Sequence, residues 1–490
     1  MCSGNYPSKT FSTASATSST FTCSTTWTRP RTGCGRSNIC PPELLGSAIL
    51  LFVFASLIPN SHTVKKLLLA SAFLCCYAAQ AQKLTHTERK IVAAVQQNMP
   101  QSEKLLEQVV NINSGTLNLK GVREVGTVFQ KEFDAIGFKT EWVPMPETMN
   151  RAGHLVAQRK GKKGKKLFLI GHLDTVFELD MPFTKYTRLN DSTATGQGVN
   201  DMKGGNVVIL AALQALHANG LLKDATITAY FTGDEERGGK GPESRADFIA
   251  KAKEADVALA FETATNLHTV ATARRGSSTW QLKTFGKAAH SSGIFKPDVG
   301  YGAIYEAARI LNSFRETLSK EQYLTFNPGL MVGGSEVNYD EAKARGEVVG
   351  KTNIIAPTAS ITGDLRFLTE AQKEAARTKM RAIVAESLPQ TRAEITFSDG
   401  LPGMAPTPGN QKLAALADQV SRDLGFGPVA AGDPGSRGGG DISYVAQYVD
   451  CLDGLGVSGK GAHAAGETIN LKEFPMLVER AALMIYRLTR

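Results

Sequence analysis

Three apolar runs in this chain stop abruptly at histidine or acidic side chains. The run LFLI precedes His172, the run ITAYFT precedes Asp234, and the run VALAF precedes Glu262. Short apolar runs without alternation are typical of strands that are buried on both faces, as in parallel sheets. Because open α/β sheets place their ligands at the carboxyl ends of such strands, we expect these polar side chains to meet at one edge of a sheet.

Four short motifs contain residue types that bind metal ions: GHLDTV (171–176), GVNDMKGG (198–205), TGDEERGG (232–239) and GAHAAGE (461–467). Together with AFET (260–263) they supply two imidazoles and three carboxylates, which is enough for two metal ions. The candidate ligands are His172, Asp201, Glu236, Glu262 and His463. This set suits zinc and is less selective against cobalt or manganese. Acidic groups crowded at one sheet edge repel one another without a cation, so solvated loops explain the pattern poorly.

Such a site predicts hydrolytic chemistry. A water molecule shared by two cations loses its proton near neutral pH, and a carboxylate beside it can take that proton and pass it to a leaving amine. Neighbouring residues of an extended segment point in opposite directions, so Glu235 and Glu236 are expected to divide two roles, one as a metal ligand and one as the base. Residue chemistry alone leaves open which is which.

The motifs and their order resemble the zinc-dependent exopeptidases and amidohydrolases. This family includes glutamate carboxypeptidases (carboxypeptidase G), aminoacylases, acetylornithine deacetylases and succinyl-diaminopimelate desuccinylases. The likeness spans about residues 83–490 and is greatest for the glutamate carboxypeptidase branch. The resemblance implies that Asp201 bridges two zinc ions. His172 and Glu262 would complete one metal site. Glu236 and His463 would complete the other.

The resemblance also assigns the residues around the ligands. It implies that Glu235 is the catalytic base and that Asp174 orients the His172 imidazole and raises its basicity. It further implies a cis peptide bond that does not involve proline, between Asp201 and Met202.

Three residues between 276 and 394 match positions that bind substrate in this family. His290 in GKAAHSSG resembles a histidine that reaches across a dimer interface to stabilise the oxyanion. Asn353 in KTNIIAP and Arg366 in GDLRF resemble the pair that holds the carboxylate and carbonyl of the substrate. On residue chemistry alone, such residues are also common on ordinary protein surfaces. Because the histidine that His290 resembles acts across a dimer interface, the resemblance also implies a homodimer formed through this part of the chain.

The order of the elements predicts two domains. Strand and helix patterns alternate through 166–270, which predicts an α/β domain whose mostly parallel sheet has helices on both faces. Between 276 and 394 the order becomes strand, helix, strand, strand, helix, strand, which is the ferredoxin-like pattern. We therefore predict a catalytic domain in two parts, 82–275 and 395–490, with an inserted α+β lid and dimerisation domain at 276–394.

The glycine-rich stretch GDPGSRGGGDISYV (432–445) resembles a phosphate-binding loop at first sight. It lacks the Lys-Ser/Thr ending and a preceding strand pattern, so nucleotide binding is rejected. In the family, a similar loop borders the substrate pocket.

The N-terminal region predicts secretion. Residues 64–81, VKKLLLASAFLCCYAAQA, combine two lysines, an apolar centre and a small-residue end, as in a signal peptide cleaved after Ala81. The segment is too short and wrongly flanked for a retained membrane helix. Residues 1–63 show no packed-domain pattern and are expected to be disordered. They are either an over-extended gene model or a leader anchored by the apolar run at 44–58. A periplasmic or secreted mature protein is expected.

Cysteine and charge usage agree with this division. Six of the seven cysteines precede Gln82, which leaves Cys451 as a buried strand residue without a disulfide partner. The segment up to Ala81 holds six of the 55 basic and one of the 46 acidic side chains, so the remaining net charge is +4. That charge is too small to predict nucleic-acid binding, and the basic run RKGKKGKK (159–166) is predicted to be a solvated hairpin loop.

The expected activity is release of a C-terminal amino acid, with glutamate favoured, from peptides or from N-acyl or folate-like conjugates. The same site could serve an N-acyl-amino-acid deacylase or a dipeptidase, because such a centre hydrolyses any amide delivered to it. A binding protein without catalysis is the remaining alternative, and the complete ligand set together with Glu235 argues against it.

Overall fold

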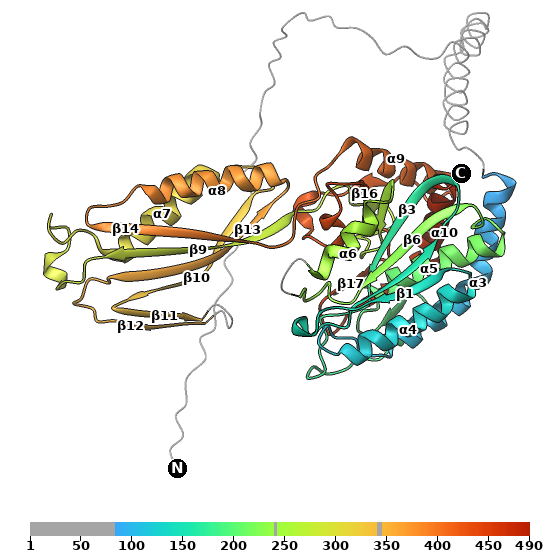
Figure 1. The fold of residues 1–490 in the computed structure, drawn as a ribbon, viewed down its shortest axis with the longest axis horizontal. Helices are drawn as coiled ribbons and strands as arrows, with labels where there is room; N and C mark the ends of the chain where they lie inside the picture. The colour runs from blue at the N-terminus through green and yellow to red at the C-terminus, as the bar shows by residue number, and fades with distance from the viewer. Residues whose placement is uncertain (1–83, 240–242, 341–344) are drawn as a thin grey trace, which may run out of the picture. The chain divides into compact units, whose positions relative to one another are not determined.

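The computed structural model describes residues 84–239, 243–340 and 345–490, and Figure 1 shows their fold. The predicted signal peptide at 64–81, the upstream segment 1–63 and six of the seven cysteines lie outside the described residues. Cys451 is buried and unpaired. No helix within the described ranges is long and apolar enough to cross a membrane.

A six-stranded sheet forms the centre of the larger domain, in the order β1-β2-β6-β3-β7-β16. Four of its strands, β6, β3, β7 and β16, are parallel, which confirms the predicted mostly parallel sheet. β2 runs antiparallel to β6, and the edge strand β1 runs antiparallel to β2, which the strand patterns did not indicate. The strands are β1 (Lys139–Val143), β2 (His154–Arg159), β3 (Lys163–His172), β6 (Ala225–Thr232), β7 (Val257–Ala260) and β16 (Asp450–Leu452).

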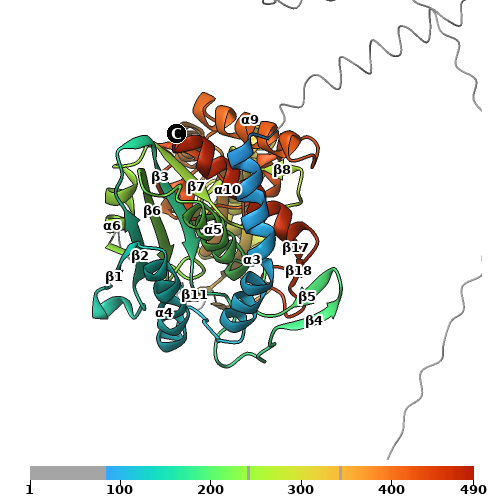
Figure 2. The same ribbon diagram turned by 90° about the vertical axis from the view of Figure 1, so that its right-hand side faces the viewer.

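Helices cover both faces of this sheet, as predicted. One face packs against most of the helices, and Figure 2 shows α3, α4, α5 and α10 on this side. The other face packs against α6 and the segment that contains Ile442 and Val445. The helices are α3 (His86–Val110), α4 (Leu119–Ala135), α5 (Lys203–Ala218), α6 (Glu243–Ala252), α9 (Pro408–Asp423) and α10 (Glu473–Leu488).

Burial on both faces explains the continuous apolar run in β3. Leu167 and Leu169 point into the core shared with α5 and α10, whereas Phe168 and Ile170 point into the core on the opposite face. Each of these side chains is at most 2% exposed. Full burial of such a side chain stabilises the fold by about 1.5–3 kcal/mol, so neither face of β3 tolerates the polar residues of an alternating strand.

The inserted domain has the predicted ferredoxin-like order. Its antiparallel sheet runs β10-β13-β9-β14, and α7 and α8 pack on one face around Trp280 and Leu282 (Figure 1). A hairpin of β11 and β12 is an addition that the sequence patterns did not reveal. The elements are β9 (Gly276–Gly286), α7 (Gly302–Leu318), β10 (Thr325–Gly334), β11 (Glu336–Asp340), β12 (Arg345–Val349), β13 (Thr358–Phe367), α8 (Glu370–Ala385) and β14 (Thr391–Asp399).

A second, small sheet in the larger domain joins distant parts of the chain, in the order β17-β18-β5-β4. It places the turn that carries His463 beside the loop that leads to Asp201. The remaining elements are β4 (Thr187–Asn190), β5 (Thr193–Thr195), β8 (Thr269–Val270), β15 (Ala430–Ala431), β17 (Gly459–Lys460), β18 (Thr468–Asn470), η1 (Glu147–Met149), η2 (Ser291–Gly293), η3 (Pro434–Ser436) and η4 (Asp441–Tyr444).

The basic run at 159–166 is not a hairpin loop, so that prediction was wrong. β3 already begins at Lys163, and β6 lies between β2 and β3 in the sheet. The side chains of Lys163, Lys165 and Lys166 are exposed along the first half of β3. Lysines therefore occupy strand positions here because the strand leaves the core.

Candidate metal centre

Five chain segments bring the predicted ligands to one edge of the sheet. His172 ends β3, Glu236 follows β6, and Glu262 follows β7, so three ligands come from adjacent parallel strands. Asp201 lies in the loop before α5, and His463 lies in the turn between β17 and β18. The expectation from the strand ends is therefore met in the structure.

The Asp201 carboxylate lies between the two histidines. Its Oδ1 is 3.3 Å from Nε2 of His172, and its Oδ2 is 3.1 Å from Nε2 of His463. One oxygen faces each imidazole, which is the arrangement that a bridging carboxylate requires.

The other two carboxylates divide between the histidines. Glu262 Oε1 lies 3.7 Å from His172 Nε2, and Glu236 Oε2 lies 3.1 Å from His463 Nε2. This pairing matches the two sets of ligands that the family resemblance implies. Glu235 also joins the cluster, since its carboxylate, the His172 imidazole and the Glu262 carboxylate have ligand atoms within 4.8 Å of one another.

The α5 segment explains how Asp201 approaches Glu262. At Gly205, in the first turn of α5, an added Cβ would lie 1.9 Å from the carbonyl oxygen of Phe261. Only glycine permits this close contact between the helix and the end of β7. The Asp201–Met202 peptide bond is cis, as the resemblance implied.

Asp174 contacts both His172 and the backbone of Glu235 and Glu236. The Nδ1 of His172 lies 3.0 Å from the Asp174 carbonyl oxygen, which orients the ring so that Nε2 faces Asp201. The Asp174 carboxylate accepts hydrogen bonds from the backbone N–H groups of Glu235 and Glu236, both at 3.1 Å. The fully buried Asp174 therefore positions the predicted base as well as a ligand, which exceeds the role expected from the sequence.

Glu467 was not identified from the sequence as a site residue. Its buried carboxylate accepts hydrogen bonds from the backbone N–H groups of Gly198, Asn200 and Asp201, at 2.9, 2.7 and 2.7 Å. These contacts fix the loop that presents the Asp201 carboxylate. The only signal in the sequence was its place at the end of GAHAAGE, four residues after His463.

The crowding of acids shifts their protonation. Desolvation raises the pKa of Glu235 well above its usual value; the charge of His172 lowers it, and the carboxylate of Glu262 raises it further. Desolvation and the charge of Asp201 raise the pKa of Glu262 to about 8. The hydrogen bonds that His463 donates to the carboxylates of Asp201 and Glu236 raise its pKa to about 11. These directions show a concentration of negative charge.

The donor set fits two divalent cations. Each of the three carboxylates lies within 3.7 Å of an imidazole nitrogen of His172 or His463. Oε1 of Glu236 is buried without a hydrogen-bond partner in the part of the chain that the structure describes. A buried carboxylate oxygen without a partner is costly, and a metal ion would satisfy it. Zinc, cobalt or manganese would all suit these ligands.

The three residues of the inserted domain that were predicted to bind substrate lie at two opposite ends of its sheet. His290 and Asn353 are neighbours, because the N–H of Ser291 donates to the carbonyl oxygen of Asn353 at 2.9 Å. Both lie beyond the end of the sheet where Thr358 pairs with Phe285. Arg366 lies near the opposite end, which continues into the larger domain through Gly276.

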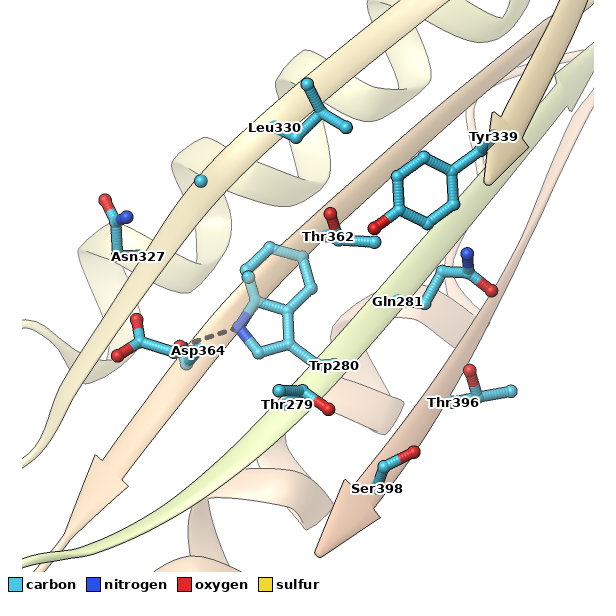
Figure 3. A pocket seen from close by; sticks show the side chains of 12 residues that line it. Thr279, Trp280, Gln281, Asn327, Leu330, Tyr339, Thr362, Asp364, Thr396 and Ser398 are labelled. Atoms are coloured by element: carbon cyan, nitrogen blue, oxygen red, sulfur yellow. Dashed lines mark hydrogen bonds between the residues drawn. The ribbon is translucent and has the colours of Figure 1, made fainter. Parts of the chain in front are cut away.

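A pocket of about 620 Å³ lies on the face of the inserted sheet that the helices leave uncovered (Figure 3). None of its lining residues belongs to the metal-ligand cluster. Its lining includes Thr279, Thr362 and Asp364. Asp364 also holds Nε of Arg366 at 2.9 Å, so the predicted carboxylate-binding arginine lies on this same uncovered face.

Comparison with known families now assigns the chain. Residues 168–487 match peptidase family M20/M25/M40. The chain belongs to this family. Members of the M20 family are metal-dependent hydrolases, so the chain is an M20 metallohydrolase of the exopeptidase and amidohydrolase group. The match covers all five ligand segments, including the turn that carries His463, together with the whole inserted domain.

Two curated M20 relatives show the range of similarity. Carboxypeptidase G2 of Pseudomonas sp. (strain RS-16) is 29% identical over 432 residues, which cover 87% of this chain and 98% of that protein. An acetylornithine deacetylase of Photorhabdus laumondii is 32% identical over 219 residues, which cover 41% of this chain and 54% of that enzyme.

Solved M20 structures share the fold. The aminopeptidase PepT of Bacillus cereus superposes with a TM-score of 0.63 at 19% identity and covers 79% of this chain and 99% of its own. A dinuclear metal-binding M20 peptidase of Bacillus subtilis superposes with a TM-score of 0.56 at 13% identity, covering 80% of this chain and 98% of its own. The predicted combination of an α/β domain and an inserted domain is thus confirmed as the M20 fold.

Proposed function

We propose that the protein is a two-metal exopeptidase that releases a C-terminal amino acid, with glutamate favoured, from peptides or N-acyl or folate-like conjugates. The observation that carries the proposal is the placement of Asp201, which directs one carboxylate oxygen to each of His172 and His463, with Glu235 beside them. The similarity to carboxypeptidase G2 along almost the whole of both chains supports the choice of substrate class.

Two divalent ions, zinc being favoured, would be held by the five ligands and would supply positive charge that polarises the scissile carbonyl and lowers the pKa of the attacking water. Glu235 accepts a proton from that water and returns it to the leaving amine. Glu236 remains a ligand, because its carboxylate pairs with His463.

Arg366 is proposed to bind the carboxylate of the departing amino acid. Asp364 holds only the Nε of its guanidinium, which leaves the two terminal nitrogens for a planar, bidentate contact. An arginine in this position favours substrates with a carboxylate near the scissile bond, which peptides and N-acyl amino acids share.

We further propose that the active unit is a homodimer formed through the inserted domain. His290 and Asn353 lie at the end of the inserted sheet away from Gly276, so they would serve the metal centre of a second subunit. Beside them, the aromatic cluster of Phe295, Tyr301 and Tyr305 is partly exposed, as is Ile304, with exposed fractions of 53% for Phe295 and 50% for Tyr305. A second copy would cover this apolar surface. A periplasmic or secreted location is proposed from the predicted signal peptide at 64–81.

The test is hydrolysis of a substrate panel by the zinc-loaded protein, with Glu235→Ala as the control. The panel contains peptides that end in glutamate, N-acetyl amino acids and plain dipeptides. Preferential release of glutamate that depends on Glu235 supports the proposal. Preference for acetylated substrates would instead assign a deacylase, as the similarity to acetylornithine deacetylase suggests, and absence of activity on all three groups would overturn the enzymatic assignment.

A further inference from the structure

The segment from Thr232 to Glu236 is held at every residue. The N–H groups of Glu235 and Glu236 donate to Asp174, and the N–H of Gly233 donates to Nδ1 of His154 at 3.1 Å. Such dense restraint of five consecutive residues fixes the direction in which the side chains of Glu235 and Glu236 leave the backbone.

The buried Arg245 of α6 forms ion pairs with Asp234 of this segment and with Asp441, which contacts the same segment. Its Nη1 lies 2.6 Å from Oδ1 of Asp234, and its Nη2 lies 2.7 Å from Oδ1 of Asp441. Ser244 Oγ also donates to Oδ2 of Asp234 at 2.6 Å. We name Asp234, Arg245 and Asp441 the buried charge cluster. All three are at most 6% exposed.

Asp441 connects this cluster back to the start of the segment. Its Oδ2 accepts a hydrogen bond from the Thr232 hydroxyl at 2.5 Å, while its Oδ1 also accepts from Nε of Arg245 at 2.8 Å. Asp441 is the second of two acidic residues in the glycine-rich stretch 432–445, which the proposed reaction does not otherwise use. The stretch therefore contacts the β6 end through a side chain.

We propose that Arg245 and Asp441 are positioning residues that hold the Glu235 carboxylate in its working orientation through Thr232 and Asp234. The inference rests on the proposed function, since it assigns Glu235 as the base. Charge pairing in a buried place is an inefficient way to stabilise a fold, because desolvation offsets much of the attraction. It does specify one geometry, and a shift of about 1 Å in a catalytic group can cost about a hundredfold in rate.

The sharpest test is Thr232→Val compared with Thr232→Ser. Valine keeps the shape of the side chain and removes the hydrogen bond to Asp441, whereas serine keeps the hydroxyl. At saturating zinc, we expect Thr232→Val to lower kcat about ten- to a hundredfold, with KM changed less than threefold and bound metal equal to that of the original protein. Thr232→Ser should retain kcat within about threefold.

Thr391→Val is the matched control. In the inserted domain, the Thr391 hydroxyl lies 3.1 Å from Oε2 of buried Glu306, and Glu306 pairs with Arg309 at 2.6 Å. This variant likewise removes a threonine hydroxyl from the carboxylate of an Arg–Glu pair, although Arg309 is partly exposed and the hydroxyl also contacts the carbonyl oxygen of Leu388 at 2.7 Å. Its kcat should stay unchanged. An equal loss of kcat in Thr232→Val and Thr391→Val would overturn the proposal, as would the original kcat in Thr232→Val.

Hydrogen exchange provides a readout that does not depend on activity. Thr232→Val should speed exchange of the Glu235 and Glu236 amides at least tenfold, while Thr391→Val should leave them unchanged. If the original protein hydrolyses no substrate of the panel, the proposed function fails, yet exchange still decides whether the cluster holds the segment. Unchanged exchange in Thr232→Val would overturn the positioning role.

Discussion

At the residue scale, the adjacent residues Glu235 and Glu236 make different contacts, which agrees with the two roles proposed for them. Asp174 anchors the backbone of both Glu235 and Glu236, but only Glu236 pairs with His463. The extended segment expected from the sequence ends at Thr232, and Glu235 and Glu236 lie in the bend and turn that follow. This turn, rather than strand alternation, directs the two carboxylates to different partners.

Replacing the base should separate catalysis from metal binding. We expect Glu235→Gln to lower kcat about a hundred- to ten-thousandfold, because the amide cannot accept the proton, while bound metal stays the same. The measurement is kcat alongside elemental analysis of the same sample. Loss of metal in this variant would show that Glu235 is a ligand and would contradict the assignment.

Glu467 should matter for metal affinity more than for folding. Glu467→Ala removes the acceptor for three N–H groups around Asp201, so we expect zinc to bind at least tenfold more weakly, as happens when outer-shell partners of metal ligands are lost. Competition with a chelator measures the change. The zinc affinity of Glu467→Gln, which keeps one acceptor oxygen, should lie between those of Glu467→Ala and the original protein.

At the element scale, the sequence predicted strands best where both of their faces are buried. The runs before His172 and Glu262 became parallel strands because both faces of β3 and β7 are covered. The antiparallel pairing of β1 and β2 and the β11–β12 hairpin were missed. β1 and β11 are partly exposed and carry no long apolar run, and the short buried strand β2 does not indicate the direction of its neighbours. Positioning contacts such as that of Glu467 were also missed, because a motif shows residue types but not which backbone they touch.

The contact between α5 and β7 should be sensitive to a single methyl group. In Gly205→Ala, the new Cβ would lie 1.9 Å from the carbonyl oxygen of Phe261, so helix and strand must separate. We expect a loss of about 1–3 kcal/mol in unfolding free energy, measured by urea titration. Gly220→Ala offers a comparison, because its Cβ would meet nothing and only its positive φ of 68° opposes the change. Equal, small losses in both variants would contradict the tight contact.

Helix α3 is stabilised by a capping box whose strength depends on pH. Glu88 accepts from the N–H of Thr85 at 2.8 Å and from Nε of Arg487 in α10 at 2.7 Å. Burial raises the pKa of Glu88, but the hydrogen bonds from Thr85 and Arg487 outweigh it, so the pKa lies below the usual 4.5. Its stabilisation is therefore present above pH 4.5 and is lost as the pH falls through the folded-state pKa.

Glu88→Gln should accordingly reduce the unfolding free energy by about 1 kcal/mol at pH 7 and progressively less below pH 4.5. Denaturant titrations at several pH values compare the two proteins. A difference in unfolding free energy between the two proteins that grows as the pH falls would contradict the prediction.

At the scale of the whole molecule, the inserted domain is expected to join two subunits. Tyr305→Glu places a charge in the partly exposed cluster with Phe295 and should convert the dimer into monomers, as measured by light scattering. Activity should fall with the dimer, because His290 would no longer reach a second subunit. A fully active monomer would contradict the proposed role of His290.

The proposed chemistry depends most on a site for two metal ions built around Asp201. The direct measurement is the number of zinc ions bound per chain at saturation, by equilibrium dialysis and elemental analysis, in the original protein and in Asp201→Ala. We predict two ions for the original protein and, at the same free zinc, fewer than one for the variant, because both sites lose their shared ligand. One ion per chain in the original protein, or two in Asp201→Ala, would contradict the bridging role on which the proposed chemistry rests.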